Sequence, residues 1–378
     1  MAKDKLEDSN VRDVLDSLDE LNPYATYLDK STLSTVSEWI DTGSLVLNSI
    51  ISGSCYGGIA VGRMTLFAGE SKVGKSLFIQ KILANAQKRG LHVIIFDTEN
   101  AIDNAGATRL GLDTSKVKYI PCKSIEQTRN SLFKLFSMIE EKGLQGKFIV
   151  AIDSFANLLS ELDLKRMDKD NVSSDSGTKA RAMKTLMQLL TNYGALTKTT
   201  VIGTNHVYDD PMAMFPSLEK HMPGGKSMAY LPSVTVQLAR KPVKEDGGKS
   251  MDGTLAPMQK NYQGLILRAL TCKNRFIKQY LEAEMYLSFD RGLDRYYGLL
   301  DLAVGVGAIV QTGSTYTLPD GTKLGHYSKF RKNKELWDNQ IIPKIEESIK
   351  VVWAYGNTIG DDEIPYEIDE EIEEIEEE

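Results

Sequence analysis

Runs of apolar residues alternate with amphipathic stretches through the middle of the chain. Six runs have the length and composition of strands: Arg63–Ala68, His92–Asp97, Val117–Ile120, Phe148–Asp153, Thr200–Thr204 and Val234–Ala239. Apolar residues at helical spacing predict helices between them: Lys75–Lys88, Ile125–Lys142 and Thr178–Leu196. Continuous apolar strands are typical of a parallel sheet that is buried on both faces. The pattern predicts a doubly wound α/β fold with a mostly parallel twisted sheet and its ligand along the carboxyl edge.

The regions on either side of this centre have other patterns. Apolar residues at helical spacing between Asn10 and Leu21 predict a short amphipathic helix that packs on a neighbour or caps its own domain. Leu265–Lys273 and Tyr280–Leu287 predict antiparallel strands, and a small α/β unit follows them. We expect a helical or oligomerisation segment over 1–34, an α/β core over 35–289, a small C-terminal domain over 290–360 and a tail over 361–378.

Two polar stretches, Ser160–Gly177 and Tyr208–Lys226, fit neither a strand nor a helix. Long loops inside a compact domain are usually functional or disordered. Each stretch follows a strand that ends at the predicted ligand edge, so we expect both loops to sense the ligand.

Composition narrows the class of protein. The chain has no run of about eighteen apolar residues, so no transmembrane helix is expected. Its charged N-terminus lacks a signal-peptide core. The three cysteines, Cys55, Cys122 and Cys272, have neither metal-ligand nor disulfide-framework spacing. These features favour a cytoplasmic protein that does not associate with membranes.

The net charge of −7 hides two different regions. Residues 361–378 contain 12 acids and no Lys or Arg, which leaves 45 basic against 40 acidic residues elsewhere, a net of +5. Blocks of like charge are usually disordered interaction tails. The pattern predicts a mildly basic body with an acidic disordered tail, whose role is either specific or only solubilising.

One motif carries the strongest chemical signal. The sequence G-E-S-K-V-G-K-S is a complete P-loop placed between a predicted strand and a predicted helix; it comprises Gly69, Glu70, Ser71, Lys72, Val73, Gly74, Lys75 and Ser76. Backbone N–H groups of such a loop surround phosphates, Lys75 reaches the β- and γ-phosphates, and Ser76 is a ligand for Mg²⁺. A nucleoside triphosphate and Mg²⁺ are therefore the expected ligands.

Other strand ends supply candidate partners for the P-loop. Asp153 ends an apolar run and is placed to hold Mg²⁺, or else to cap a helix. Asp97 and Glu99 lie at and just past another strand end, and one of them is expected to act as the base for hydrolysis. Alternation along the strand does not decide between them. His206 follows a further strand, and a γ-phosphate contact and a structural role both stay open.

The order and spacing of several segments resemble the RecA-type recombinases, most closely the UvsX-like recombinases of tailed bacteriophages. Besides the P-loop, the resemblance rests on D-T-G-S-L-V-L-N-S-I-I-S-G from Asp41, F-D-T-E-N-A-I-D from Phe96, A-I-D-S-F-A-N-L from Ala151, P-G-G-K from Pro223, C-K-N-R from Cys272 and Y-G-L-L-D-L-A from Tyr297. The matching region runs from about Thr35 to Gly307. It implies a RecA-like P-loop NTPase core whose nucleotide is ATP.

The resemblance also implies roles for individual residues. Glu99 takes the position of the catalytic base, Asp103 that of an adenine contact, and His206 that of a γ-phosphate sensor, where RecA itself has Gln. Lys273 and Arg275 match two cations that act on the ATP of the adjacent subunit. Ser160–Gly177 and Tyr208–Lys226 match two DNA-binding loops, in which the expected contacts are Arg181, Met214, Phe215, Gly224, Gly225 and Lys226. The family often stacks an aromatic residue on adenine where this chain has Gly106.

We therefore expect a DNA-dependent ATPase that forms helical filaments on single-stranded DNA and catalyses homologous pairing and strand exchange. Its partners would be single-stranded DNA, duplex DNA as second substrate, further copies of itself, a single-strand-binding protein and a recombination mediator. A ring-forming, helicase-like motor and a non-recombinase nucleotide-binding accessory protein are the alternatives. Intact Lys75, Ser76, Glu99 and Asp153 disfavour the last.

Overall fold

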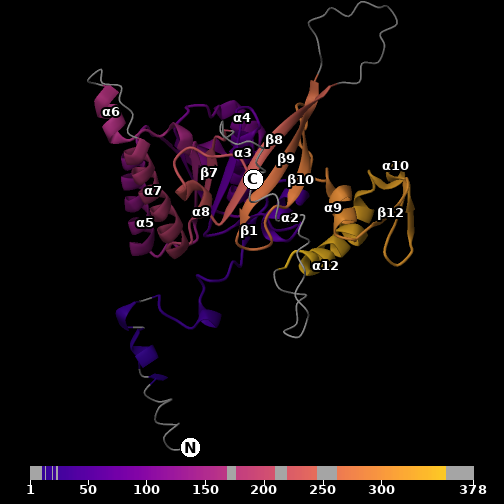
Figure 1. Cartoon of the computed structure of the whole chain (residues 1–378), viewed down its shortest axis with the longest axis horizontal. Helices are drawn as coiled ribbons and strands as arrows, with labels where there is room; N and C mark the ends of the chain where they lie inside the picture. Colours follow the sequence, from indigo (N-terminus) through magenta and orange to yellow (C-terminus); the bar gives the residue numbers. More distant parts are fainter. Residues whose placement is uncertain are drawn as a thin grey trace, which may run out of the picture. The chain divides into compact units, whose positions relative to one another are not determined.

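Apolar strands form one large sheet in the computed structural model, which describes residues 11–12, 14–18, 20–22, 24–167, 176–208, 219–244 and 262–354 (Figure 1). The strand order in the described sheet is β11-β10-β9-β8-β3-β7-β6-β4-β5. The strands are β3 Met64–Gly69, β4 His92–Asp97, β5 Val117–Pro121, β6 Phe148–Asp153, β7 Thr200–Asn205, β8 Val234–Lys244, β9 Tyr262–Asn274, β10 Glu282–Ser288 and β11 Gly292–Leu293.

The predicted parallel core is confirmed. Strands β8, β3, β7, β6, β4 and β5 pair in parallel, and all six residues of β3 and of β7 are buried. The predicted antiparallel strands are also confirmed, since β9 pairs with both β8 and β10. Strands β8 and β9 are longer than their apolar runs because they form an antiparallel arm whose backbone pairing continues past the buried residues, through Arg240 and Lys241.

Helices cover both faces of the parallel strands. Helices α5, Ile125–Glu141, and α7, Ser176–Leu196, pack against one face, where Leu132 and Phe136 of α5 join Met187 of α7 in one apolar core with β3, β4, β6 and β7 (Figure 1). Helix α3, Lys75–Lys88, covers the other face, and its Phe78 ring stacks on Phe67 of β3 at 6.4 Å between ring centroids. This arrangement directs the start of α3 and the carboxyl ends of β3, β4, β6 and β7 to one edge.

The first polar stretch contains a helix, so the prediction that Ser160–Gly177 is wholly irregular is wrong. Helix α6 spans Glu161–Met167. Its start is closed reciprocally, because Asp163 N donates to Ser160 Oγ at 3.1 Å and Ser160 N donates to Asp163 Oδ2 at 3.3 Å. Acids lie in its first turn and bases in its last, which favours a short helix without apolar periodicity. Residues 168–175 lie outside the described part.

The chain divides into two compact units, Met1–Leu299 and Leu300–Glu378. Shorter elements of the first unit are η1 Leu28–Lys30, β1 Trp39–Ile40, α2 Leu45–Ser52, β2 Ile59–Ala60, α4 Asn104–Arg109, η2 Thr114–Lys116, η3 Phe155–Asn157 and α8 Ser227–Tyr230. The described residues of the predicted N-terminal helix, 11–12, 14–18 and 20–21, are helical, and their apolar side chains are exposed.

The second unit begins within α9, Leu299–Gly305. It contains a small antiparallel sheet and short helices: β12 Val310–Thr312, β13 Thr315–Thr317, β14 Lys323–Gly325, α10 Tyr327–Phe330, α11 Lys334–Leu336, the π-helical turn Trp337–Ile341 and α12 Ile342–Val352. The Phe330 ring contacts the rings of Tyr316 and Trp337 at centroid distances of 5.8 and 5.9 Å. The predicted tail, 361–378, lies outside the described residues. No described helix is long and apolar enough to span a membrane.

Candidate functional site

The P-loop lies where β3 ends and α3 begins. Gly69 packs so closely on β8 that a Cβ there would lie 2.6 Å from the carbonyl oxygen of Leu238. Gly74 precedes α3 with φ of 85°, a left-handed conformation that glycine adopts without strain. No side chain caps the start of α3, so the first N–H groups of this helix face the loop. The sequence thus builds an anion site from backbone donors and a helix N-terminus.

Lys75 is the buried cation of this site. Its Nζ donates to the carbonyl oxygens of Gly69 and Glu70, both at 2.8 Å, and the side chain thereby folds back over the loop. Burial lowers the pKa of Lys75, while the carboxylates of Glu99, Asp153 and Glu70 act in the opposite direction. These carbonyl bonds would be exchanged for phosphate oxygens when a nucleotide binds.

Ser76 and Asp153 meet beside Lys75 and suit a divalent cation. Asp153 is buried at the end of β6 and accepts hydrogen bonds from the hydroxyls of Thr204 and Ser76. Burial and the nearby charges of Glu99 and Asp97 raise the pKa of Asp153, so a cation would relieve the crowding of these carboxylates. Among the described residues, no three His, Cys, Asp or Glu side chains could hold a metal together. Mg²⁺ beside a nucleotide usually binds one or two protein oxygens, phosphates and water, and this pair fits that pattern.

The two acids that the sequence could not separate have different surroundings. Asp97 is 1% exposed, and its carboxylate accepts from Glu99 N at 2.8 Å, Asn100 N at 2.9 Å and the Tyr119 hydroxyl at 3.0 Å. Through the two backbone bonds, Asp97 stabilises the turn after β4. Glu99 is partly exposed, accepts from Ser154 Oγ at 2.8 Å and faces the P-loop side. Of the two acids, Glu99 is therefore the one whose carboxylate faces the P-loop, whereas Asp97 is held in the turn.

His206 links this site to the second polar stretch. Its Nε2 lies 3.5 Å from Glu99 Oε1, and its backbone N–H donates to Asn205 Oδ1 at 2.9 Å. Asn205 is buried and donates from Nδ2 to the carbonyl oxygen of Pro223 at 3.0 Å. Side chains at the end of β7 thus contact both Glu99 and the turn before Gly224.

The expected DNA contacts fall into two groups. Gly225 packs on α7 so closely that a Cβ there would lie 3.3 Å from the Cβ of Ala180, and Arg181, the next residue, is exposed. Lys226 is exposed at the start of α8. The structure therefore brings Arg181, Gly224, Gly225 and Lys226 into one region. Met214 and Phe215 lie outside the described residues.

Lys273 and Arg275 lie at the opposite edge of the sheet from the P-loop. Lys273 pairs with Thr235 near the start of β8, beside the start of β3. Lys273 Nζ donates to the carbonyl oxygen of Tyr230, and Arg275 Nη2 lies 3.4 Å from the same atom. The two cations thus converge on one carbonyl oxygen, and the P-loop of their own subunit is out of their reach.

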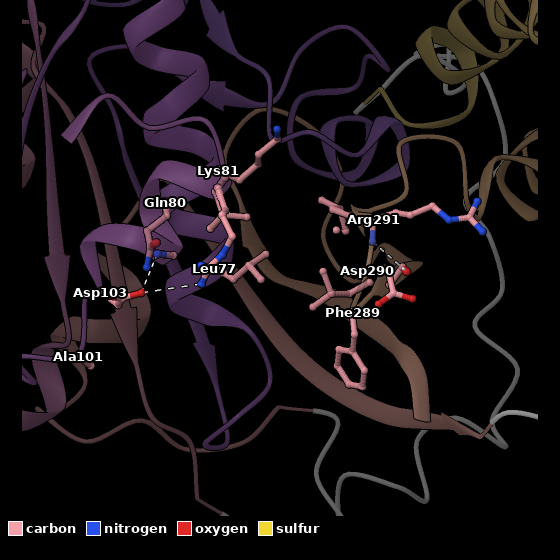
Figure 2. Close-up of a pocket in the computed structure, with 15 residues that line it drawn as sticks. Leu77, Gln80, Lys81, Ala101, Asp103, Phe289, Asp290 and Arg291 are labelled. Atoms are coloured by element: carbon pink, nitrogen blue, oxygen red, sulfur yellow. Dashed lines mark hydrogen bonds and ion pairs between the residues drawn. The ribbon is translucent and has the colours of Figure 1, made fainter. Parts of the chain in front are cut away.

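A cavity of about 530 Å³ next to α3 contains residues that the sequence did not single out. Figure 2 shows Leu77 and Asp103 on one side and Phe289 with Arg291, from the β10–β11 turn, on the other. Asp103 caps α4 by accepting from Gly106 N at 2.7 Å, and Gly106 also lines the cavity. Phe289 is 58% exposed, so its ring is accessible from the cavity. Only its place in a turn between two polar residues, Ser288 and Asp290, marked it in the sequence.

The chain is similar to known proteins over most of its length. A family model described as the RecA N-terminal domain matches residues 26–293. The protein named Protein RecA of Mycobacterium marinum is 28% identical over 324 residues, which are 85% of this chain and 86% of that protein. Protein RecA of Streptomyces rimosus is 28% identical over 318 residues, 83% of this chain and 78% of the relative. Protein RecA of Arthrobacter sp. is 27% identical over 320 residues, 84% of each chain.

Proposed function

The chain belongs to the RecA family, whose members are DNA-dependent ATPases and recombinases, and we propose that it forms helical filaments on single-stranded DNA and exchanges strands with homologous duplex DNA. ATP with Mg²⁺ would lie at the P-loop, with Ser76 and Asp153 as the protein's contacts to the ion. The ion would neutralise charge on the phosphates.

The filament proposal rests on the distance between the P-loop residues and the two cations Lys273 and Arg275, which we regard as two halves of one ATP site. Lys75, Ser76, Glu99 and Asp153 lie at the carboxyl edge of the sheet, whereas Lys273 and Arg275 lie at its amino edge. Strand β3 has six residues, so these edges are about 17 Å apart. Cations at the amino edge can act on a triphosphate only in a neighbouring subunit. A contact of this head-to-tail kind generates an open helix when its rotation does not close.

The residues of the carboxyl edge suggest how hydrolysis is coupled to DNA. Glu99 would take a proton from the attacking water, and Lys75 and the neighbour's two cations would stabilise charge on the transferred phosphoryl group. His206 lies beside Glu99, and its neighbour Asn205 donates to the carbonyl oxygen of Pro223, in the turn that leads to Gly224 and Gly225. Hydrolysis or release of the γ-phosphate would therefore change the position of the proposed DNA contacts.

The proposal extends to the subgroup of the protein, its N-terminal helix and its partner proteins. His206, at a position where RecA itself has Gln, supports a place among UvsX-like phage recombinases, and with it action in the host cytoplasm. Exposed apolar residues of the N-terminal helix, among them Val14 and Leu18, support its role in subunit contact. A phage recombinase would also work with a single-strand-binding protein and a mediator.

Strand exchange with the wild type and with Lys75→Ala tests the function. The wild type is expected to hydrolyse ATP faster when single-stranded DNA is added, to form filaments in electron micrographs and to exchange strands, whereas Lys75→Ala would neither hydrolyse ATP nor exchange strands. Rings in the micrographs would instead favour the helicase-like motor. ATPase activity that single-stranded DNA does not stimulate would contradict the proposal.

ATP-dependent assembly should weaken as the pH rises above about 8. Burial and the neighbouring Arg275 lower the pKa of Lys273 to about 8 in the free subunit, and phosphate in the interface would raise it again. Because the assembled state then has the higher pKa, this contribution to assembly is fully present below the free pKa. It begins to fall above that pKa and is lost as the pH rises through the higher pKa of the assembled state. Burial raises the pKa of the adjacent Cys272 to about 12, so this thiol does not titrate in the same window.

Light scattering between pH 7 and 9.5 measures this dependence, and Lys273→Arg supplies the control because its side chain stays charged. An identical pH profile for both proteins would exclude Lys273 as the titrating group.

Phe289 is expected to stack on the adenine in the cavity beside Asp103, which offsets the missing aromatic residue at Gly106. Phe289→Ala should raise the KM for ATP roughly tenfold, since stacking of one base on an aromatic ring contributes about 1–3 kcal/mol. Tyr56→Ala is a control of equal exposure, 58%, outside the cavity. Steady-state kinetics with both variants decide, and equal KM values for Phe289→Ala and wild type would refute the stacking.

A further inference from the structure

The P-loop contains an acid where a phosphate is expected to bind. Glu70 is the second residue of the loop, and its carboxylate side chain is 65% exposed. Its carbonyl oxygen accepts from Lys75 Nζ, so its backbone is fixed at the site while its side chain points elsewhere. A carboxylate this close to a triphosphate opposes nucleotide binding unless another charge offsets it.

Lys220 provides that charge from a distant part of the sequence. Its Nζ lies 2.8 Å from Glu70 Oε1. Its backbone is fixed by Gln237 of β8, because Lys220 N donates to Gln237 Oε1 at 3.0 Å and Gln237 Nε2 donates to the Lys220 carbonyl oxygen at 2.8 Å. Gln237 is itself buried. Two hydrogen bonds to a buried side chain thus hold the backbone of Lys220 next to the P-loop.

The neighbouring charged residues show which cation forms the ion pair with Glu70. Glu70 and Lys220 line a cavity of about 360 Å³ together with Arg240, Arg268 and Glu282. Arg268 is paired with Glu282, with Nε 2.9 Å from Oε2. Lys220 therefore makes the direct ion pair with Glu70, and Arg240 adds a further positive charge to the lining of the cavity.

We propose that Lys220 is a positioning residue for nucleotide binding: it draws the Glu70 carboxylate away from the phosphate site and offsets its charge. Lys220 belongs to Tyr208–Lys226, the segment proposed as the second DNA-binding loop, so the ion pair also makes nucleotide affinity depend on the state of that segment. This second consequence rests on the proposed function, whereas the charge compensation itself requires only that the P-loop binds ATP.

Four variants test the pair: Lys220→Ala, Lys220→Arg, Glu70→Gln and the double variant Lys220→Ala with Glu70→Gln. Affinity is measured by titration with a fluorescent ATP analogue and Mg²⁺, with and without single-stranded DNA. Lys220→Ala should weaken binding roughly fivefold, as expected for the loss of a partly exposed ion pair beside further negative charge. Lys220→Arg and the double variant should bind as the wild type does, and the difference should shrink at high salt.

A matched ion pair controls for general effects. Lys116 lies 2.8 Å from Asp113 on η2, outside this cavity, so Lys116→Ala removes an equally close pair without a change in affinity. Melting temperatures detect any loss of folding. Wild-type affinity in Lys220→Ala, or weak binding that Glu70→Gln does not restore, would overturn the proposal.

The DNA-dependent part has its own outcome. Single-stranded DNA should change the nucleotide affinity of the wild type more than that of the double variant, and equal changes would remove the link to DNA. Because the titration needs no hydrolysis, a wild type without DNA-stimulated ATPase activity would count against the proposed function alone.

Discussion

Glu99→Gln should bind ATP like the wild type and lose at least about 100-fold in DNA-stimulated hydrolysis, in line with the 10²–10⁴-fold that a positioned base contributes. The amide keeps the size of the side chain and its bond from Ser154 Oγ, but it cannot accept the proton of the attacking water. Single-turnover hydrolysis with saturating DNA measures the chemical step, and nucleotide titration measures binding.

Asp97→Asn is the informative control because Asp97 and Glu99 are two residues apart. Asp97 accepts three hydrogen bonds while buried, so its replacement should lower the melting temperature. Glu99→Gln should leave the melting temperature unchanged. If Glu99→Gln hydrolysed ATP at the wild-type rate, the assignment of the base to Glu99 would be wrong.

This pair of acids shows how far the sequence alone could go. Apolar runs predicted the parallel strands because burial on both faces demands apolar residues in succession. The same runs placed Asp97 and Asp153 at strand ends, and hence at one edge. They could not tell Asp97 from Glu99, since that difference depends on long-range contacts as well as local ones. The Tyr119 hydroxyl reaches Asp97 from β5, the adjacent strand in the sheet, and Ser154 donates to Glu99.

Other features of the fold and the site could not be predicted from the sequence for related reasons. Helix α6 is stabilised by its own capping and charge pattern, which a search for apolar periodicity overlooks. Phe289 is 186 residues from Asp103 in sequence, and only the fold of the β10–β11 turn beside α3 makes them neighbours. The pair of Glu70 and Lys220 likewise depends on Gln237, which fixes Lys220 against β8. Long-range side-chain pairs of this kind carry no local signal.

Mixing two inactive variants should restore ATP hydrolysis if the site is shared between subunits. Lys75→Ala lacks the P-loop cation but keeps Lys273 and Arg275, whereas the double variant Lys273→Ala with Arg275→Ala keeps an intact P-loop. Each variant alone should be almost inactive. In a random filament of equal parts, one kind of joint in four combines an intact loop with intact cations, so about a quarter of wild-type activity is expected.

Because the two halves of the site lie at opposite edges of one sheet, a mixture of two variants that are damaged at the same edge provides a control. A second mixture, of Lys75→Ala with Glu99→Gln, should stay inactive, because both changes damage the carboxyl-edge half and no joint receives a complete one. ATPase activity is measured across mixing ratios, with electron microscopy to establish that mixed filaments form. If mixed filaments form and the first pair of variants recovers nothing, then Lys273 and Arg275 do not complete a neighbour's site. In that case the position of Lys273 and Arg275 at the sheet edge opposite the P-loop would need another explanation.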